Sequence, residues 1–181
     1  MSNKTATGEF VAQHLNDGDV KDRDIQPNGV DLTVGEIFRT SGSVRFEDDG
    51  DYSKPNRTKI ELKYPDRAKA LPYYSLVSGQ YPIVYDEKIE IPEGYVGRVY
   101  PRSRLMRSGL HLTSALWDQG YEGVGEGLLQ VPQSIQRVRV PVEMPIAQMV
   151  FKPAEEAKAY DGTHQQERLV KKTDGGYGVT D

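Results

Sequence analysis

The sequence predicts a single, mainly β domain, a distorted β-barrel or jelly roll with a short N-terminal helix. The 181 residues suit one domain. Eighteen glycines and eleven prolines favour frequent turns over a helical bundle. Many short segments have β-type character and are separated by Gly, Pro, Asp or Ser, a spacing typical of barrels, sandwiches and jelly rolls.

The helix is expected within residues 7–18, where apolar residues recur at helical spacing. Thr7 is a candidate N-cap, and the Asn-Asp-Gly sequence at 16–18 is expected to end the helix. The β-type runs lie at residues 30–38, 58–64, 81–91, 95–100, 110–117, 127–131, 136–142 and 146–151. Residues 46–58 are polar and are expected to form a solvated loop. The pattern fades near residue 153, which predicts a β domain over 1–152 and a polar C-terminal arm over 153–181.

Composition excludes several classes of function. A net charge of −4 and a pI near 5.5 argue against nucleic acid as a partner. The chain has no cysteine, which excludes disulfides, thiol catalysis and the cysteine ligands of a zinc-dependent base deaminase. The first residues lack the apolar core of a signal peptide, and no apolar run is long enough to span a membrane. We therefore expect a soluble, cytoplasmic protein with no membrane partner.

The familiar nucleotide motifs are also absent. There is no P-loop pattern. The glycines of GVGEG at 123–127 lead into a β-type run rather than a helix, so they do not match a dinucleotide fingerprint. The three histidines show no metal-ligand spacing, and we expect them to be ordinary surface or core residues.

Three short stretches could carry chemistry. YPRSRLMRSGL places Arg102, Ser103, Arg104 and Arg107 within six residues, and such groups either bind phosphate or form a solvated basic turn. In LWDQGYEG, Asp118 is a candidate general base or metal ligand, or simply a turn residue.

The third stretch is the tail KKTDGGYGVTD, which surrounds one aromatic ring with three glycines. By itself this composition indicates a disordered tail. The alternative is a lid that folds onto a flat ligand, because glycine allows unusual backbone angles.

Taken together, the motifs resemble the dUTPase/dCTP deaminase superfamily, and most of all its archaeal dUTPase branch. IQPNGVDLTVG resembles the N-terminal motif of the superfamily, and YPRSRLMRSGL resembles its phosphate-binding motif. LWDQGYEG resembles the motif with the catalytic aspartate, and MPIAQMVF resembles a later strand motif. YEGVGEGLLQV, followed later by YDGTHQQERL, is the feature most similar to the archaeal branch.

The resemblance implies a dUTP diphosphatase that converts dUTP to dUMP and pyrophosphate, with Mg²⁺ bound through the triphosphate. It implies a homotrimer with the dUTPase-like β-clip fold and active sites shared between subunits. Asp118 would be the catalytic residue, and Tyr121 would stack under the deoxyribose. The other implied substrate contacts are Arg102, Ser103, Arg104, Arg107, Gln148, Tyr160, Gln165, Lys172 and Tyr177.

Within the resemblance, the tail corresponds to a flexible motif that closes the active site. Tyr177 would stack on the uracil, and Lys172 stands where the motif has arginine, keeping the charge but losing the bidentate fork. Arg104 replaces the second serine of the phosphate motif and either binds phosphate or faces solvent.

The main alternative is a dCTP deaminase, or an enzyme that performs both reactions. Such enzymes carry a catalytic glutamate ten residues beyond the motif aspartate, where this chain has Leu128. Glu126 lies two residues earlier, about 7 Å away along a strand, too far to substitute without a register shift. A second alternative is a non-catalytic nucleotide-binding regulator on the same fold, which the presence of Asp118 and the tail motif argues against.

Overall fold

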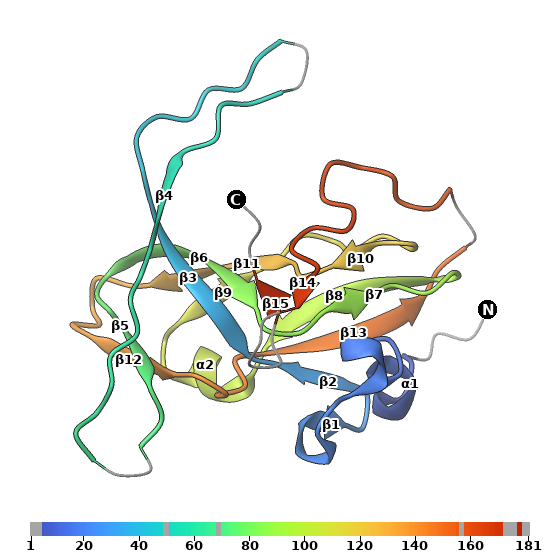
Figure 1. Ribbon diagram of the computed structural model, residues 1–181, viewed down its shortest axis with the longest axis horizontal. Helices are drawn as coiled ribbons and strands as arrows, with labels where there is room; N and C mark the ends of the chain where they lie inside the picture. The colour runs from blue at the N-terminus through green and yellow to red at the C-terminus, as the bar shows by residue number, and fades with distance from the viewer. Residues whose placement is uncertain (1–4, 49–50, 68–69, 156–157, 172–176, 179–181) are drawn as a thin grey trace.

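The computed structural model describes residues 5–48, 51–67, 70–155, 158–171 and 177–178. These residues are mainly β, and their two short α-helices are α1 (Gly8–Ala12) and α2 (Ser103–Arg107) (Figure 1). Two 3₁₀ turns cover Asn16–Gly18 and Asp22–Asp24. No helix among the described residues is long and apolar enough to cross a membrane.

Four strands form an antiparallel sheet at one side of the core. Their order is β1 (Ile25–Gln26), β2 (Gly29–Leu32), β13 (Ala147–Pro153) and β8 (Tyr95–Pro101). The register sets Ala147 opposite Leu32 on one side and opposite Pro101 on the other. This pairing brings the start of β13 next to the segment that enters α2.

Five strands form a second antiparallel sheet. Their order is β4 (Asn56–Lys59), β3 (Val34–Ser41), β6 (Gly79–Tyr85), β11 (Glu126–Val131) and β9 (His111–Thr113). Along β11 the side chains alternate, so Leu129 is fully buried whereas Leu128 is partly exposed. Leu128 lies opposite Pro82 on one neighbour and Thr113 on the other.

Three two-stranded sheets complete the domain. They pair β7 (Ile89–Glu90) with β10 (Glu122–Gly123), β5 (Tyr73–Leu76) with β12 (Val138–Pro141), and β14 (Val170–Lys171) with β15 (Tyr177–Gly178). The inward faces of the strands and α1 share one large apolar cluster, which includes Tyr74, Tyr85 and Phe151. Burial of this apolar surface is the main favourable term in folding.

Residues 42–48 and 51–55, in the connection between β3 and β4, project away from the body of the molecule (Figure 1). An isolated bridge joins Phe46 to Tyr52, and their ring centroids lie 6.0 Å apart. The segment is exposed, as its polar sequence predicts, but its second half also forms a wall of the largest cavity. The expected solvated loop is therefore also part of the cavity wall, which its polar sequence does not predict.

The mainly β class and the N-terminal helix are confirmed, and the Thr7 hydroxyl accepts a hydrogen bond from Phe10 N at 3.3 Å. The helix is shorter than expected, because it ends at Ala12 and residues 16–18 form a separate 3₁₀ turn. The strand expected over 58–64 is largely wrong, because β4 ends at Lys59. The unforeseen elements include α2, which lies within the arginine-rich motif, and the strands β1, β5, β10, β14 and β15. Closure of the sheets into one barrel, and the division at residue 152, stay predictions.

Candidate active site

The largest cavity described has a volume of about 730 Å³ and is assembled from distant segments of the chain. Its walls come from residues 51–57, from the turn at 115–121, from the start of β11 and from residues 160–168 of the arm. Asp118, Tyr121 and Tyr160 all line this cavity. The structure therefore brings together three residues that the sequence singled out.

Backbone hydrogen bonds fix the turn that carries Asp118. Trp117 exchanges two hydrogen bonds with Gly97, at 2.8 and 3.1 Å, and Gly120 N donates to Ile91 O at 2.8 Å. Gly120 has φ of 78°, a left-handed conformation that glycine adopts without strain. Trp117 and Gln119 are buried on either side, so the turn directs only Asp118 outward as an exposed carboxylate.

Tyr121 forms a buried aromatic wall beside Asp118. Its side chain is 6% exposed, and its ring meets Trp117 edge-on, with centroids 5.1 Å apart and planes at 85°. Tyr160 lies on another side, at 5.9 Å between centroids. The Tyr121 hydroxyl donates to Glu167 Oε1 at 2.9 Å. Burial, and then the Glu167 carboxylate, raise the pKa of Tyr121 well above its usual range, so the hydroxyl keeps its proton at neutral pH.

Close packing explains the glycines of GVGEG. A Cβ built on Gly125 would lie 2.1 Å from the Trp117 ring, and one on Gly127 would lie 2.5 Å from the Tyr85 hydroxyl. Any larger residue would push β11 away from the two aromatic side chains. The motif is therefore a packing feature beside the cavity, in agreement with its exclusion as a dinucleotide fingerprint.

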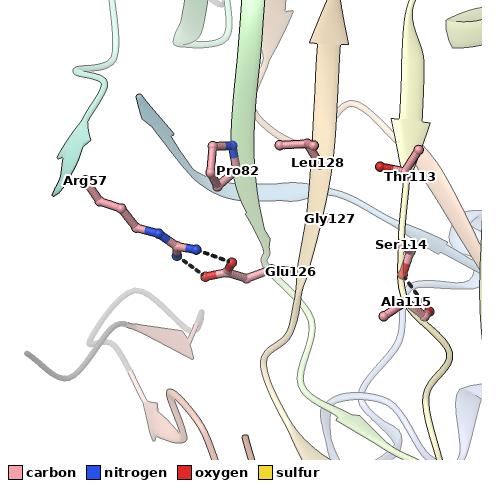
Figure 2. Close-up of a pocket in the computed structure, with 8 residues that line it drawn as sticks. All are labelled: Arg57, Pro82, Thr113, Ser114, Ala115, Glu126, Gly127 and Leu128. Atoms are coloured by element: carbon pink, nitrogen blue, oxygen red, sulfur yellow. Dashed lines mark hydrogen bonds and ion pairs between the residues drawn. The ribbon is translucent and has the colours of Figure 1, made fainter. Parts of the chain in front are cut away.

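A network of charged side chains lines the cavity. Both Nη atoms of Arg57 donate to the Glu126 carboxylate, one of them at 3.0 Å, as Figure 2 shows. Arg168 also pairs with Glu126, and its Nη1 donates to Glu167 Oε2 at 2.8 Å. Sequence analysis missed Arg57, Glu167 and Arg168. Residues about 40 to 70 positions apart form the pairs of Glu126, and no local pattern predicts such contacts.

The arm packs along the turn between Gly120 and Val124. Gln165 accepts from Glu122 N at 3.1 Å and donates to Gly120 O at 2.8 Å, so its amide is bound to the backbone of the turn. Val124 N donates to Glu167 O at 3.0 Å. Of the tail residues, Lys172 lies outside the described residues, and the Tyr177 backbone belongs to β15, paired with Lys171.

The remaining predicted residues gather at a different place, around α2 and β13. Arg102 precedes α2 and forms an ion pair with the buried Asp31 at 2.7 Å, although its alignment is not that of a hydrogen bond. Arg102 Nη1 also donates to Gln148 Oε1 at 3.3 Å, and Gln26 Nε2 donates to Asp31 Oδ2 at 3.3 Å.

Burial raises the pKa of Asp31 to about 6, although the charges of Arg102 and, more weakly, Arg104 oppose the shift. The nearby Asp24 carboxylate adds to it. Along α2, Ser103, Arg104 and Arg107 are exposed while Leu105 anchors the helix in the core. Neither these side chains nor Gln148 line the cavity that holds Asp118, so one chain keeps the two groups apart.

A smaller cavity of about 320 Å³ lies next to the first and shares Arg57, Ala115 and Glu126 with it. Leu128 lines it together with Thr113 and Ser114, as Figure 2 shows. Leu128 has no group that could carry a proton, and the Glu126 carboxylate is occupied by two guanidinium groups.

Comparisons with known proteins agree with this geometry. A family model described as dCTP deaminase-like matches residues 2–154. A Halobacterium salinarum protein named probable deoxyuridine 5'-triphosphate nucleotidohydrolase is 41% identical over 165 residues, which cover 89% of this chain and 93% of that protein. A Methanocaldococcus jannaschii protein named deoxyuridine 5'-triphosphate nucleotidohydrolase is 34% identical, covering 81% of this chain and 90% of that protein.

Among solved structures, the 2'-deoxycytidine 5'-triphosphate deaminase from Agrobacterium tumefaciens resembles the chain with a TM-score of 0.55 at 14% sequence identity. The match covers 80% of this chain but only 45% of the solved chain. At that identity the likeness concerns the fold alone.

Proposed function

The chain belongs to the dCTP deaminase-like family, and within it we propose that the protein hydrolyses dUTP to dUMP and pyrophosphate. Such an enzyme keeps uracil out of DNA and supplies dUMP. The observation that carries the proposal is the exposed Asp118 carboxylate at the edge of an aromatic-walled cavity. The names of the archaeal relatives support the same activity. The cysteine-free composition fits a cytoplasmic location.

Asp118 is the proposed general base. Its carboxylate accepts a proton from a water molecule, which attacks the α-phosphorus of dUTP, and pyrophosphate leaves. Three features of the turn favour this role: the side chain is exposed, its backbone is fixed by Gly97 and Ile91, and its neighbours are buried. A base held on a rigid turn is ready for proton transfer without reorganisation.

Tyr121 is the proposed contact for the sugar. Its ring would stack under the deoxyribose and leave no room for a 2′-hydroxyl. The ring is buried, held edge-on by Trp117, and bounds the same cavity as Asp118. Tyr160 and Gln165 on the arm are proposed to help enclose the nucleotide, and Gln165 already anchors the arm to the turn.

The phosphates are proposed to bind residues of a second copy of the chain, in a homotrimer with shared sites. Arg102, Ser103, Arg104, Arg107 and Gln148 are the contacts concerned. Their separation from the cavity within one chain supports this arrangement. Arginine side chains and a hydroxyl match phosphate oxygens well. Arg104 and Arg107 are exposed, and so are available to a neighbouring copy.

Mg²⁺ is the proposed cofactor, held through the triphosphate. Within the described ranges no group of three carboxylate or histidine side chains forms a metal site. The donor set fits a cation that keeps most of its waters and binds substrate phosphates, as Mg²⁺ commonly does. When bound, the ion would offset the charge that develops on the leaving pyrophosphate.

The tail is proposed to close the site over the base. Tyr177 would stack on the uracil and Lys172 would contact the phosphates. The antiparallel pairing of β15 with β14 supports the proposal, because it places the backbone of Tyr177 against the end of the arm. Closing such a lid excludes water and adds contacts in the closed complex.

The rival activity is deamination of dCTP, which the family description keeps open. Incubation with dUTP and dCTP separately, each with Mg²⁺, distinguishes the two by their products. We expect dUMP and pyrophosphate from dUTP and no product from dCTP, because Leu128 replaces the required acid. Formation of dUTP or dUMP from dCTP, at a rate comparable to dUTP hydrolysis, would overturn the assignment.

A further inference from the structure

We infer that Glu167 is a positioning residue that holds the Tyr121 ring and thereby sets the selectivity for deoxyribose over ribose. The inference rests on the proposed function, because it concerns the sugar of the same nucleotide. Neither Glu167 nor its contact with Tyr121 follows from the sequence motifs. The contact joins the C-terminal arm to the turn of Asp118 across 46 residues.

The hydroxyl of Tyr121 is the one point at which a polar bond restrains this ring. Trp117 meets the ring edge-on and Tyr160 lies near a second side, but aromatic contacts allow a ring to slide and tilt. The hydrogen bond to Glu167 Oε1, at 2.9 Å, is directional and made to a carboxylate. Hydrogen bonds to ionised acceptors are stronger than neutral ones. Glu167 therefore fixes the far end of the ring.

Glu167 is itself held firmly. Its second oxygen accepts from Arg168 Nη1 at 2.8 Å and lies 3.3 Å from His164 Nδ1. Arg168 Nη1 also donates to Val124 O at 3.1 Å, and the same guanidinium pairs with Glu126. The carboxylate is thus tied through Arg168 to strand β11, and not only to the arm.

The backbone around Glu167 gives a second, independent observation. Gln166 and Arg168, its two neighbours, both have φ of 56°, a left-handed conformation that is uncommon for residues with a side chain. Two backbone hydrogen bonds hold this segment against residues 122–124, from Gln166 N to Glu122 O at 2.7 Å and from Val124 N to Glu167 O. Unfavourable backbone conformations of this kind cluster at functional sites. Here they direct Glu167 toward Tyr121.

Selectivity for deoxyribose requires that the Tyr121 ring keeps its position when a ribonucleotide enters the cavity. An apolar pocket discriminates by only about 10²-fold against an isostere that merely carries a hydroxyl, so stronger rejection of a 2′-hydroxyl needs a wall that excludes the added atom. A ring that can tilt would admit the 2′-hydroxyl of a ribonucleotide. Restraint of Tyr121 by Glu167 is therefore expected to favour dUTP specifically, rather than to raise turnover of all nucleotides.

The test compares kcat/KM for dUTP and for UTP in the native protein, in four single variants and in one double variant. Tyr121→Phe removes the hydroxyl, Glu167→Ala removes the acceptor, and Glu167→Gln keeps an acceptor without the charge. Asp161→Ala is the matched control, because Asp161 is an exposed carboxylate on the same arm that pairs only with Lys158 among the described residues. Thermal melts accompany each assay.

We expect the dUTP-to-UTP ratio to fall about tenfold in Tyr121→Phe and in Glu167→Ala, the order expected for loss of one charge-assisted hydrogen bond. The double variant Tyr121→Phe/Glu167→Ala should match either single variant, since both remove the same bond. Glu167→Gln should recover most of the ratio, and Asp161→Ala should keep all of it. A role confined to folding predicts lower melting temperatures with an unchanged ratio, which would overturn the inference.

A second readout does not depend on activity. Trp117 is the only tryptophan of the chain and touches Tyr121, so its emission reports on the position of that ring. Glu167→Ala and Tyr121→Phe should change this emission alike, whereas Asp161→Ala should not. Failure of the native protein to hydrolyse dUTP contradicts the proposed function and not this contact. Unchanged emission in Glu167→Ala shows that Glu167 does not position the ring.

Discussion

The cavity that holds Asp118 and the surface around α2 differ in the side chains that each could offer to a nucleotide. The cavity has a base, an aromatic wall and two arginines, Arg57 and Arg168, that are already paired with carboxylates. The α2 surface has exposed arginines, and the carboxylate paired with Arg102, Asp31, is buried. The cavity is the proposed site for the nucleoside and the attacking water, and the α2 surface is the proposed site for phosphate.

The difference explains why neither region is a complete site for a triphosphate. Several negative charges must be balanced, and the two arginines of the cavity are paired with Glu126 and Glu167, which leaves Lys54 as the other lysine or arginine of its described lining. In the proposed assembly, α2 of one copy would supply the missing positive charge to the cavity of another. Closed symmetric assemblies use such heterologous contacts routinely.

The largest effect is expected on the cavity side, from Asp118→Asn. The amide cannot accept the proton of the attacking water, so kcat for dUTP should fall by about 10²–10⁴ while binding is largely preserved. Asp118 is exposed, so the melting temperature should hardly change. The measurement pairs steady-state hydrolysis with dUTP binding by calorimetry. Near-normal turnover would place the base elsewhere, with Glu126 the first candidate.

On the α2 side, the double variant Arg104→Ala/Arg107→Ala should act mainly on KM. Loss of two charged phosphate contacts should raise KM for dUTP by roughly 10- to 100-fold, at about 1.5 kcal/mol or less for each contact. Both side chains are exposed, so the fold should be preserved. Lys158→Ala, an exposed cation on the arm, is the control. An unchanged KM would remove α2 from the phosphate site.

The smallest expected effect is on the pH dependence of the unfolding free energy, through the buried carboxylate of Asp31. Burial raises the pKa of Asp31 to about 6 in the folded chain, above the ordinary value of 3.8, so folding favours the protonated acid. The associated stability is fully present below pH 3.8 and is lost as pH rises through 6. Relative to Asp31→Asn, the native chain should lose about 1 kcal/mol of unfolding free energy between pH 5 and pH 7.

Urea denaturation of both proteins at the two pH values measures this difference. A native chain that instead gains stability over the same interval would show that the ion pair with Arg102 outweighs the cost of burying the carboxylate.

Much of the fold could be predicted because strand periodicity is local. The alternation of β11, the run of β13 and the Thr7 cap are all visible within a few residues. The arginine-rich motif was different. Within α2, Leu105 is the buried residue, and one inward apolar side chain in five residues gives no periodicity from which to predict the helix.

The candidate site could be predicted only where a residue belongs to a motif. Asp118 and Tyr121 share a short turn, and the structure places both at one cavity. Arg57, Glu126, Glu167 and Arg168 meet only because β4, β11 and the arm converge, and nothing in a linear sequence shows which charges will pair. The polar residues near Tyr52 look like any solvated loop until the fold sets them against the turn.

Subunit complementation tests the central claim most directly. Asp118→Asn and Arg104→Ala/Arg107→Ala are co-expressed with different tags, and the mixed assemblies are isolated and assayed with dUTP at a concentration limiting for the α2 variant. If each site joins the cavity of one copy to α2 of another in a homotrimer, every mixed trimer has both halves intact at one of its three sites, about a third of the total. We predict that the mixture recovers about that fraction of native activity. Activity no greater than the average of the two parent variants would show that each site lies within a single chain.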